Sequence, residues 1–184
     1  WKDGETGYPM VDATMKMLHH TGWINMRMRG MVLSFAVNEL WLHWREPALF
    51  LAREFVDYEP AIHYNQMQIH AGTADASSML AYNPVKQAQE LDPEGIFVRR
   101  WIPAMQAVPD AYIFEPWTMP LAVQTACGIT IGKDYPAPLV DHLEAARLAR
   151  SRVADAQIAA GIRQRTGRGK AGHHIVGTSQ PGLF

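Results

Sequence analysis

The chain has 184 residues, 48% of them hydrophobic, and a net charge of −1 at pH 7. This length suffices for one domain with its own core, and the near-neutral charge argues against a broadly basic nucleic-acid binder. No apolar run reaches the roughly 18 residues of a membrane span, and the single Cys127 permits no internal disulfide. The protein is therefore expected to bind no membrane and to lie in the cytoplasm.

The first helix is predicted to follow a glycine-rich turn. Pro9 suits the first position of a helix, Val11 and Leu18 share one face of it, and Gly22 suits its C-cap. A chain that begins at Trp1 is expected to be processed, trimmed or part of a longer protein.

Residues 21–44 predict a long helix with apolar residues on most of its sides. Arg27 and Arg29 fit such a helix only where each guanidinium reaches water, an acidic partner or an anionic ligand. The helix is expected to end near Trp44, because Pro47 cannot continue it but can start the next one.

Asp57 and Glu59 lie in a short loop before a helix that is predicted to begin at Pro60. These two carboxylates have two interpretations, since they either cap the helix or form part of a binding site. Further on, residues 73–98 predict an irregular connection with short helices, and residues 139–165 predict a terminal amphipathic helix.

The expected fold class is an all-α helical bundle, because no strand-like alternation extends beyond a few residues. Residues 1–150 are expected to form the domain, 151–166 the end of its last helix, and 167–184 a flexible basic tail. No metal site is expected. The histidine pairs at 19/20, 63/70 and 173/174 lack the additional ligands that a zinc site needs.

Several sequence blocks follow one another in a specific order within residues 1–150. They are W-x-x-G-x-T-G-Y-P-x-V-D-A-x-M, T-G-W-x-x-x-R-x-R, D-Y-E, Y-N-P, D-P-E-G, R-R-W-I-P, E-P-W and D-Y-P-A-P. Together they resemble the carboxy-terminal part of the FAD-binding helical domain of the photolyase/cryptochrome superfamily. The amino-terminal antenna domain of that family has no counterpart in this sequence. The resemblance implies FAD as the cofactor.

By their positions in these blocks, Asp57 is implied to lie beside the flavin and to pair with Arg29. The carboxylate would accept hydrogen bonds from the flavin, while the guanidinium would neutralise it and favour an electron-rich reduced ring. The other residues that the resemblance places in the FAD site are Tyr58, Glu59, His63, Met26 and Met67.

Three of these positions depart from the pattern of the repair enzymes. Met26 and His63 stand where asparagines of the flavin pocket are usual in the family. Met67 stands at the tryptophan nearest the ring, which is the first donor of the usual light-driven tryptophan chain. Because methionine is a poorer electron donor than indole, the usual route of photoreduction is interrupted here.

Trp44 and Trp1 are the candidates for electron transfer. Trp44 matches the middle tryptophan of that chain, and Trp1 matches a family tryptophan close to the flavin. An alternative role for Trp44 is that of a core anchor. Tyr64 and Trp23 are further candidate donors, since they lie near the interrupted step in the sequence.

Arg27, Gln87 and Ile69 are the residues that the resemblance assigns to DNA binding. Arg27 and Gln87 match positions that contact the DNA backbone, and Ile69 replaces a tryptophan on which the lesion stacks. Arg27 is either a phosphate clamp or a surface arginine that pairs with a neighbour. Losing the stacking aromatic is expected to cost roughly 1–3 kcal/mol of lesion binding.

The resemblance implies a flavoprotein like deoxyribodipyrimidine photo-lyase, in which light drives electron transfer from reduced FAD to repair pyrimidine dimers in UV-damaged DNA. Single strands are the expected preference, because flipping a base out of a duplex costs energy. The alternative is a cryptochrome-like blue-light sensor or flavin-binding module without repair activity. A third interpretation is a helical protein without flavin. A homodimer or a missing N-terminal segment is expected to complete the flavin pocket.

Overall fold

The computed structural model describes residues 1–73 and 81–161 of the chain, and the helices in these ranges confirm the predicted all-α class. No β-strand occurs within the described ranges, where one isolated bridge joins Ile131 and Tyr135. Short turns of 3-10 helix lie at Pro103–Met105, Asp110–Tyr112 and Pro116–Thr118. The α-helices are α1 (Pro9–Thr21), α2 (Met26–Ser34), α3 (Arg45–Glu54), α4 (Pro60–His70), α5 (Pro84–Leu91), α6 (Ile96–Trp101), α7 (Leu121–Cys127) and α8 (His142–Ala159).

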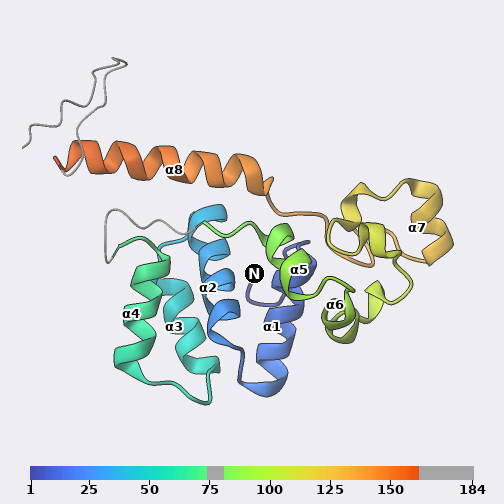
Figure 1. Ribbon diagram of the computed structural model, residues 1–184, viewed down its shortest axis with the longest axis horizontal. Helices are drawn as coiled ribbons and strands as arrows, with labels where there is room; N and C mark the ends of the chain where they lie inside the picture. The colour runs from blue at the N-terminus through green and yellow to red at the C-terminus, as the bar shows by residue number, and fades with distance from the viewer. Residues whose placement is uncertain (74–80, 162–184) are drawn as a thin grey trace, which may run out of the picture.

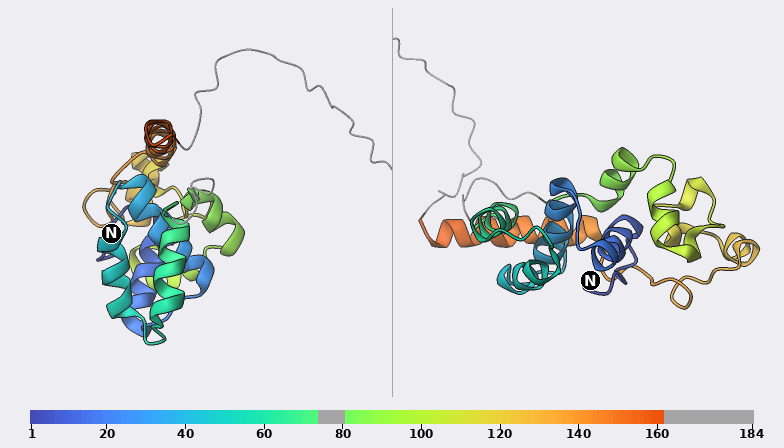
Figure 2. Two further views of the ribbon diagram at one scale, coloured as in Figure 1. Left: turned by 90° about the vertical axis from the view of Figure 1, so that its left-hand side faces the viewer. Right: turned by 90° about the horizontal axis from the view of Figure 1, so that it is seen from below.

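Helix α2 lies at the centre of the fold, in contact with α1 on one side and α4 on the other (Figure 1). Helix α3 packs against α4, and α5 and α6 pack against α1. Helix α8 runs along one edge of the group, as the end-on view in Figure 2 shows. The main core lies between α1, α2, α3 and α4, and a second core lies around α6 and the 3-10 turns.

The predicted ends of α1 and the predicted start of α4 are confirmed. Pro9 and Pro60 each occupy the first position of their helix, where the missing N–H costs no hydrogen bond. Gly22 ends α1 with a φ of 69°, and its N–H donates to the Leu18 carbonyl. Glycine adopts this left-handed conformation without the steric cost that other residues meet.

The prediction of a continuous helix that reaches Trp44 is wrong. Helix α2 ends at Ser34 and is followed by a π-helical turn, Phe35–Glu39, after which Trp41 has a φ of 54°. A bulky residue in this left-handed region breaks the helix by changing the direction of the backbone. Helix α3 then starts at Arg45, so that Pro47 lies in its first turn, where no intrahelical N–H is needed.

The terminal helix is shorter at its start than predicted. The side chain of Asp141 accepts hydrogen bonds from the backbone N–H groups of Leu143 and Glu144, and this N-cap begins the helix at His142. The expected domain boundary at residue 150 therefore falls within α8. The flexible tail expected at 167–184 lies outside the described residues. No helix in the described part of the chain has the length and apolar character needed to cross a membrane.

A buried carboxylate ties the N-terminal loop to the loop that precedes α8. Asp12 accepts hydrogen bonds from Thr6 N and Oγ1 at 2.7 Å each, from Gly7 N at 3.0 Å and from the Tyr135 hydroxyl at 2.5 Å. Burial raises the pKa of Asp12, and these hydrogen bonds oppose that shift. The four donors thus fix the start of α1 against the N-terminal loop and the loop that contains Tyr135.

We expect Tyr135→Phe to lower the free energy of unfolding by about 2 kcal/mol, because Asp12 loses one hydrogen bond in a buried site. Urea unfolding followed by circular dichroism measures this change. Tyr112→Phe, at a half-buried tyrosine of the second core, is the matched control and should change stability by less than about 0.5 kcal/mol. Equal effects of the two substitutions would contradict the role given to the Asp12 site.

Candidate functional site

A pocket of about 150 Å³ opens between the start of α2, the loop before α4 and one face of α4. The structure brings together in it all seven residues that the sequence predicted for the FAD site. Their role toward a flavin stays a prediction. The residues that line the pocket are Met26, Arg29, Asp57, Tyr58, Glu59, Ile62, His63, Gln66 and Met67.

The sequence analysis missed two residues of this wall, Ile62 and Gln66. Both follow from helical spacing. They lie three and seven positions after Glu59, and therefore on the same face of α4 as His63 and Met67. The periodicity of α4 was thus a signal that could have found them.

The ion pair between Arg29 and Asp57 forms the charged side of the pocket. Nη2 of Arg29 lies 2.8 Å from each carboxylate oxygen of Asp57, and Nε donates to the Ile24 carbonyl at 2.9 Å. The guanidinium also lies 4.0 Å from the ring centre of Phe55. The Arg29 side chain is only 11% exposed, whereas that of Asp57 is 46% exposed. Asp57 therefore has free oxygen surface with which to accept a ligand's N–H or O–H groups.

Glu59 has the capping role that was one of the two interpretations of the acidic loop. Its Oε2 accepts a hydrogen bond of 2.7 Å from the backbone N–H of Ile62 and so caps α4. Asp57, by contrast, is not the cap residue of α4, since its carboxylate pairs with Arg29. The two acids of the loop therefore have separate roles.

Met67 and His63 form the buried floor of the pocket, while Met26 lies at its exposed rim. His63 Nε2 lies 2.9 Å from the Ala48 carbonyl oxygen, which can only accept, so Nε2 carries the hydrogen. Burial lowers the pKa of His63, and the nearby charge of Arg29 lowers it further. The imidazole is therefore neutral at pH 7. Arg29 is then the positive charge beside Asp57, because His63 carries none.

The two tryptophans predicted for electron transfer do not line the pocket. Trp1 packs edge-on against Phe50, with ring centres 5.6 Å apart, and its indole N–H donates to the Val32 carbonyl. Trp44 stacks on His43 at 6.2 Å and packs against the main core. Both positions agree with an anchoring role, and electron transfer by either stays a prediction.

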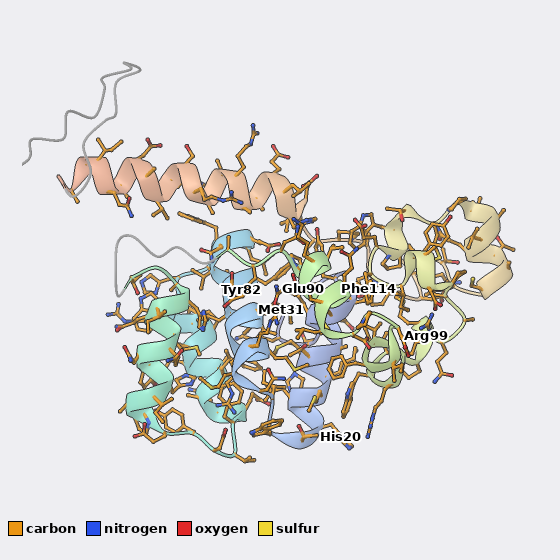
Figure 3. All side chains as sticks on the ribbon, viewed as in Figure 1. His20, Met31, Tyr82, Glu90, Arg99 and Phe114 are labelled. Atoms are coloured by element: carbon orange, nitrogen blue, oxygen red, sulfur yellow. The ribbon has the colours of Figure 1, made fainter. Side chains whose placement is uncertain are left out.

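None of the residues predicted to contact DNA lines the pocket. Arg27 Nε donates to Gln87 Oε1 at 2.9 Å, and Arg27 also forms an ion pair with Glu90, which Figure 3 labels on α5. Arg27 thus has the neighbouring partner that its second interpretation required. Ile69 is half-buried on α4 and does not line the pocket.

No group of three or more His, Cys, Asp and Glu residues within residues 1–73 and 81–161 could hold a metal ion. The histidine pair 173/174, which was considered and not expected to bind a metal, lies outside these ranges.

Comparison with known proteins gives one consistent family. Residues 1–155 match the sequence model of the FAD binding domain of DNA photolyase. A deoxyribodipyrimidine photo-lyase of Alkalihalophilus pseudofirmus is 38% identical over 144 residues, which make up 77% of this chain and 30% of that protein. Cryptochrome DASH of Gloeobacter violaceus is 36% identical over 147 residues, or 79% of this chain and 29% of that protein.

Solved structures give the same result. The Synechocystis sp. PCC6803 cryptochrome has a TM-score of 0.79 and 34% identity, with 82% of this chain and 32% of that chain covered. A bacterial class III photolyase from Agrobacterium tumefaciens has a TM-score of 0.78 and 36% identity, with 84% and 33% covered. The chain thus spans about a third of the length of each solved structure.

Proposed function

This chain belongs to the family of FAD-binding domains of DNA photolyase, and on that premise we propose that its pocket between α2 and α4 holds the isoalloxazine ring of FAD. The observation that carries the proposal is the Arg29–Asp57 pair at the side of a pocket whose floor is the buried thioether of Met67. An aromatic ring with polar edges needs such a combination of apolar floor and hydrogen-bonding rim.

The chemistry of the lining residues fits the ring. Asp57 would accept hydrogen bonds from ring N–H or ribityl O–H groups, and Arg29 would favour the added negative charge of the reduced state. Met67, which is buried, would exclude water from the floor side of the ring. Bound FAD supplies the absorption of blue light and the one-electron chemistry, while the protein supplies position and electrostatics.

The size of the pocket indicates that further surface completes the site. Its volume of about 150 Å³ is smaller than the roughly 300–1,000 Å³ of typical small-molecule sites. Exposed apolar side chains at the rim, those of Met26 and Ile62, offer area for such a surface. We propose that a second copy of the chain or a further protein segment covers the rest of FAD.

The proposed activity is light-driven repair of UV-induced pyrimidine dimers in DNA by electron transfer from reduced FAD. Two kinds of observation support it. The relatives include deoxyribodipyrimidine photo-lyases, and Arg27, hydrogen-bonded to Gln87, is a polar group to which a phosphate could bind. Single-stranded lesions are the proposed preference, because no base pair has to be opened.

A light sensor without repair activity is the second candidate function. The specific observation in its favour is that Glu90 already pairs with Arg27, so a DNA phosphate would have to displace a carboxylate. In addition, Ile69 offers no aromatic surface for a flipped base.

Blue-light irradiation of UV-damaged oligothymidine tests the proposed repair activity. With FAD-loaded, chemically reduced protein we expect loss of dimers, measured by chromatography, with single strands repaired at least severalfold faster than duplexes. A dark sample is the control. Unchanged dimers, together with a light-induced change in the flavin spectrum, would contradict repair and support the sensor.

A further inference from the structure

A second cleft lies between the π-helical turn and α8, which packs against this turn at the end of α2 (Figure 1). None of the residues that line this cleft also lines the pocket between α2 and α4. The cleft has a volume of about 280 Å³, close to the lower limit of roughly 300 Å³ for typical small-molecule sites. It therefore has room for a slender ligand.

Glu39 brings an unsatisfied carboxyl oxygen to the wall of this cleft. The residue is 5% exposed, and its Oε2 has no hydrogen-bond partner among the described residues. A buried polar atom without a partner costs free energy, so such atoms are rare in native structures. The π-helical turn that carries Glu39 belongs to a class that occurs frequently at functional sites. A ligand with an N–H group would supply the missing partner.

Two further carboxylates line the cleft from α8, those of Asp141 and Glu144. Both hydrogen bonds of the α8 cap go to Oδ1 of Asp141, which leaves Oδ2 to accept from a ligand. Arg152 is the basic residue of this wall, and its guanidinium lies 4.9 Å from the ring centre of Trp41. Because the acids outnumber this arginine, the charge of the cleft favours a cationic ligand.

The arrangement of the acids favours an extended organic cation over a metal ion. In the part of the chain that the structure describes, the three acids of the cleft form no group that could hold a single metal ion. The apolar side chains of Val140, Ala145 and Leu148 line the same cleft. An aliphatic chain with an ammonium group at each end would place methylene groups against these side chains and its charges against the acids.

We propose that this cleft binds a linear aliphatic polyamine, with one ammonium group at Glu39 and another at Asp141 and Glu144. Each ammonium group donates charge-assisted hydrogen bonds to carboxylate oxygens. The inference concerns a different surface from the FAD pocket and does not depend on the binding of flavin.

Binding should release a proton from Glu39. Burial raises the pKa of this carboxyl to about 9, so it is protonated at pH 7.5 without ligand, whereas a neighbouring ammonium group favours the ionised form. The nearby Tyr8 keeps its proton, because burial raises its pKa to about 12. Hydrogen bonds from the backbone of α8 lower the pKa of Asp141, so it is already ionised. Glu144 is exposed and ionised, and Arg152 is protonated.

Isothermal titration calorimetry of the full chain with spermidine, at pH 7.5 and about 0.15 M salt, tests the inference. We expect saturable binding of one spermidine and the release of up to one proton, measured from the dependence of the heat on the ionisation enthalpy of the buffer. Butylamine, which carries a single ammonium group, should bind at least tenfold more weakly. Absence of saturable binding, or equal affinity for the two amines, would overturn the proposal.

Substitutions locate the site. Glu39→Gln keeps the shape of the side chain and should lower the affinity for spermidine at least tenfold and abolish the proton release. Glu144→Gln should lower the affinity severalfold and keep the proton release. Glu94→Gln, at an exposed acid before α6, changes the net charge equally and should leave both unchanged.

Two results with these variants would overturn the assignment. Equal losses of affinity in Glu39→Gln and Glu94→Gln would show that spermidine responds to net charge alone. Proton release that persists in Glu39→Gln would show that another group titrates on binding.

Discussion

Asp57→Ala is expected to lower the FAD content of the purified protein at least about tenfold. The substitution removes an acceptor for ring N–H groups and leaves the Arg29 guanidinium, with its 11% exposed side chain, without its carboxylate partner. Hydrogen bonds to charged groups contribute about 1.5–3 kcal/mol, and 1.4 kcal/mol is a factor of ten in binding. Flavin absorbance relative to protein concentration, after incubation with FAD and gel filtration, measures the effect.

The Arg99–Asp110 ion pair offers a matched control outside the pocket (Figure 3 labels Arg99 on α6). Nη2 of Arg99 lies 2.5 Å from Asp110 Oδ1, so Asp110→Ala breaks a similar pair without touching the pocket. It should leave FAD content unchanged. Asp57→Asn, which keeps one acceptor oxygen, should fall between the wild type and Asp57→Ala. Full FAD content in Asp57→Ala would refute the assignment of this residue.

Glu39→Gln is expected to change the pH dependence of stability strongly. Glu39 is 5% exposed, in the π-helical turn against which α8 packs. Burial raises the pKa of its carboxyl to about 9. Oε2 of Glu39 has no hydrogen-bond partner among the described residues, so nothing there stabilises the ionised form.

The sign of the effect follows from the raised pKa. Between the ordinary pKa of a glutamate and about 9, the folded protein holds a proton on Glu39 that the unfolded chain has released. The contribution of Glu39 to the free energy of unfolding is therefore largest at low pH. It falls as the pH rises, by about 1.4 kcal/mol per pH unit. Between pH 6 and pH 8 the wild type should thus lose roughly 3 kcal/mol of stability through Glu39 alone.

Urea unfolding of wild type and Glu39→Gln at both pH values measures this loss, and the substituted protein should lack it. Glu144→Gln, at an exposed residue in the first turn of α8, is the control and should keep the slope of the wild type. Parallel pH profiles of wild type and Glu39→Gln would show that Glu39 is ionised in the fold.

The parts of the fold set by local chemistry could be predicted from the sequence. Pro9, Pro60 and Gly22 determine helix ends through the geometry of their own backbones, which no distant contact has to supply. The π-helical turn and the left-handed Trp41 could not be predicted in this way. They lie where α8 packs, and that contact joins residues about 100 positions apart in the chain.

The candidate site shows the same division. The resemblance of two short motifs placed Arg29 and Asp57 together, and the structure has them 2.8 Å apart. The contact between Tyr58 and Tyr64 depends on the angle at which the loop enters α4, and the pairing of Arg27 with Glu90 depends on where α5 docks. Local sequence preferences determine neither this angle nor this docking position, so both could be known only from the structure.

The absorption spectrum of the purified wild-type protein after FAD is added and the excess is removed tests the central claim most directly. The Arg29–Asp57 pocket predicts a retained flavin band in the blue, with saturable uptake. A protein that is folded by circular dichroism but keeps no flavin at any concentration of FAD would contradict the account.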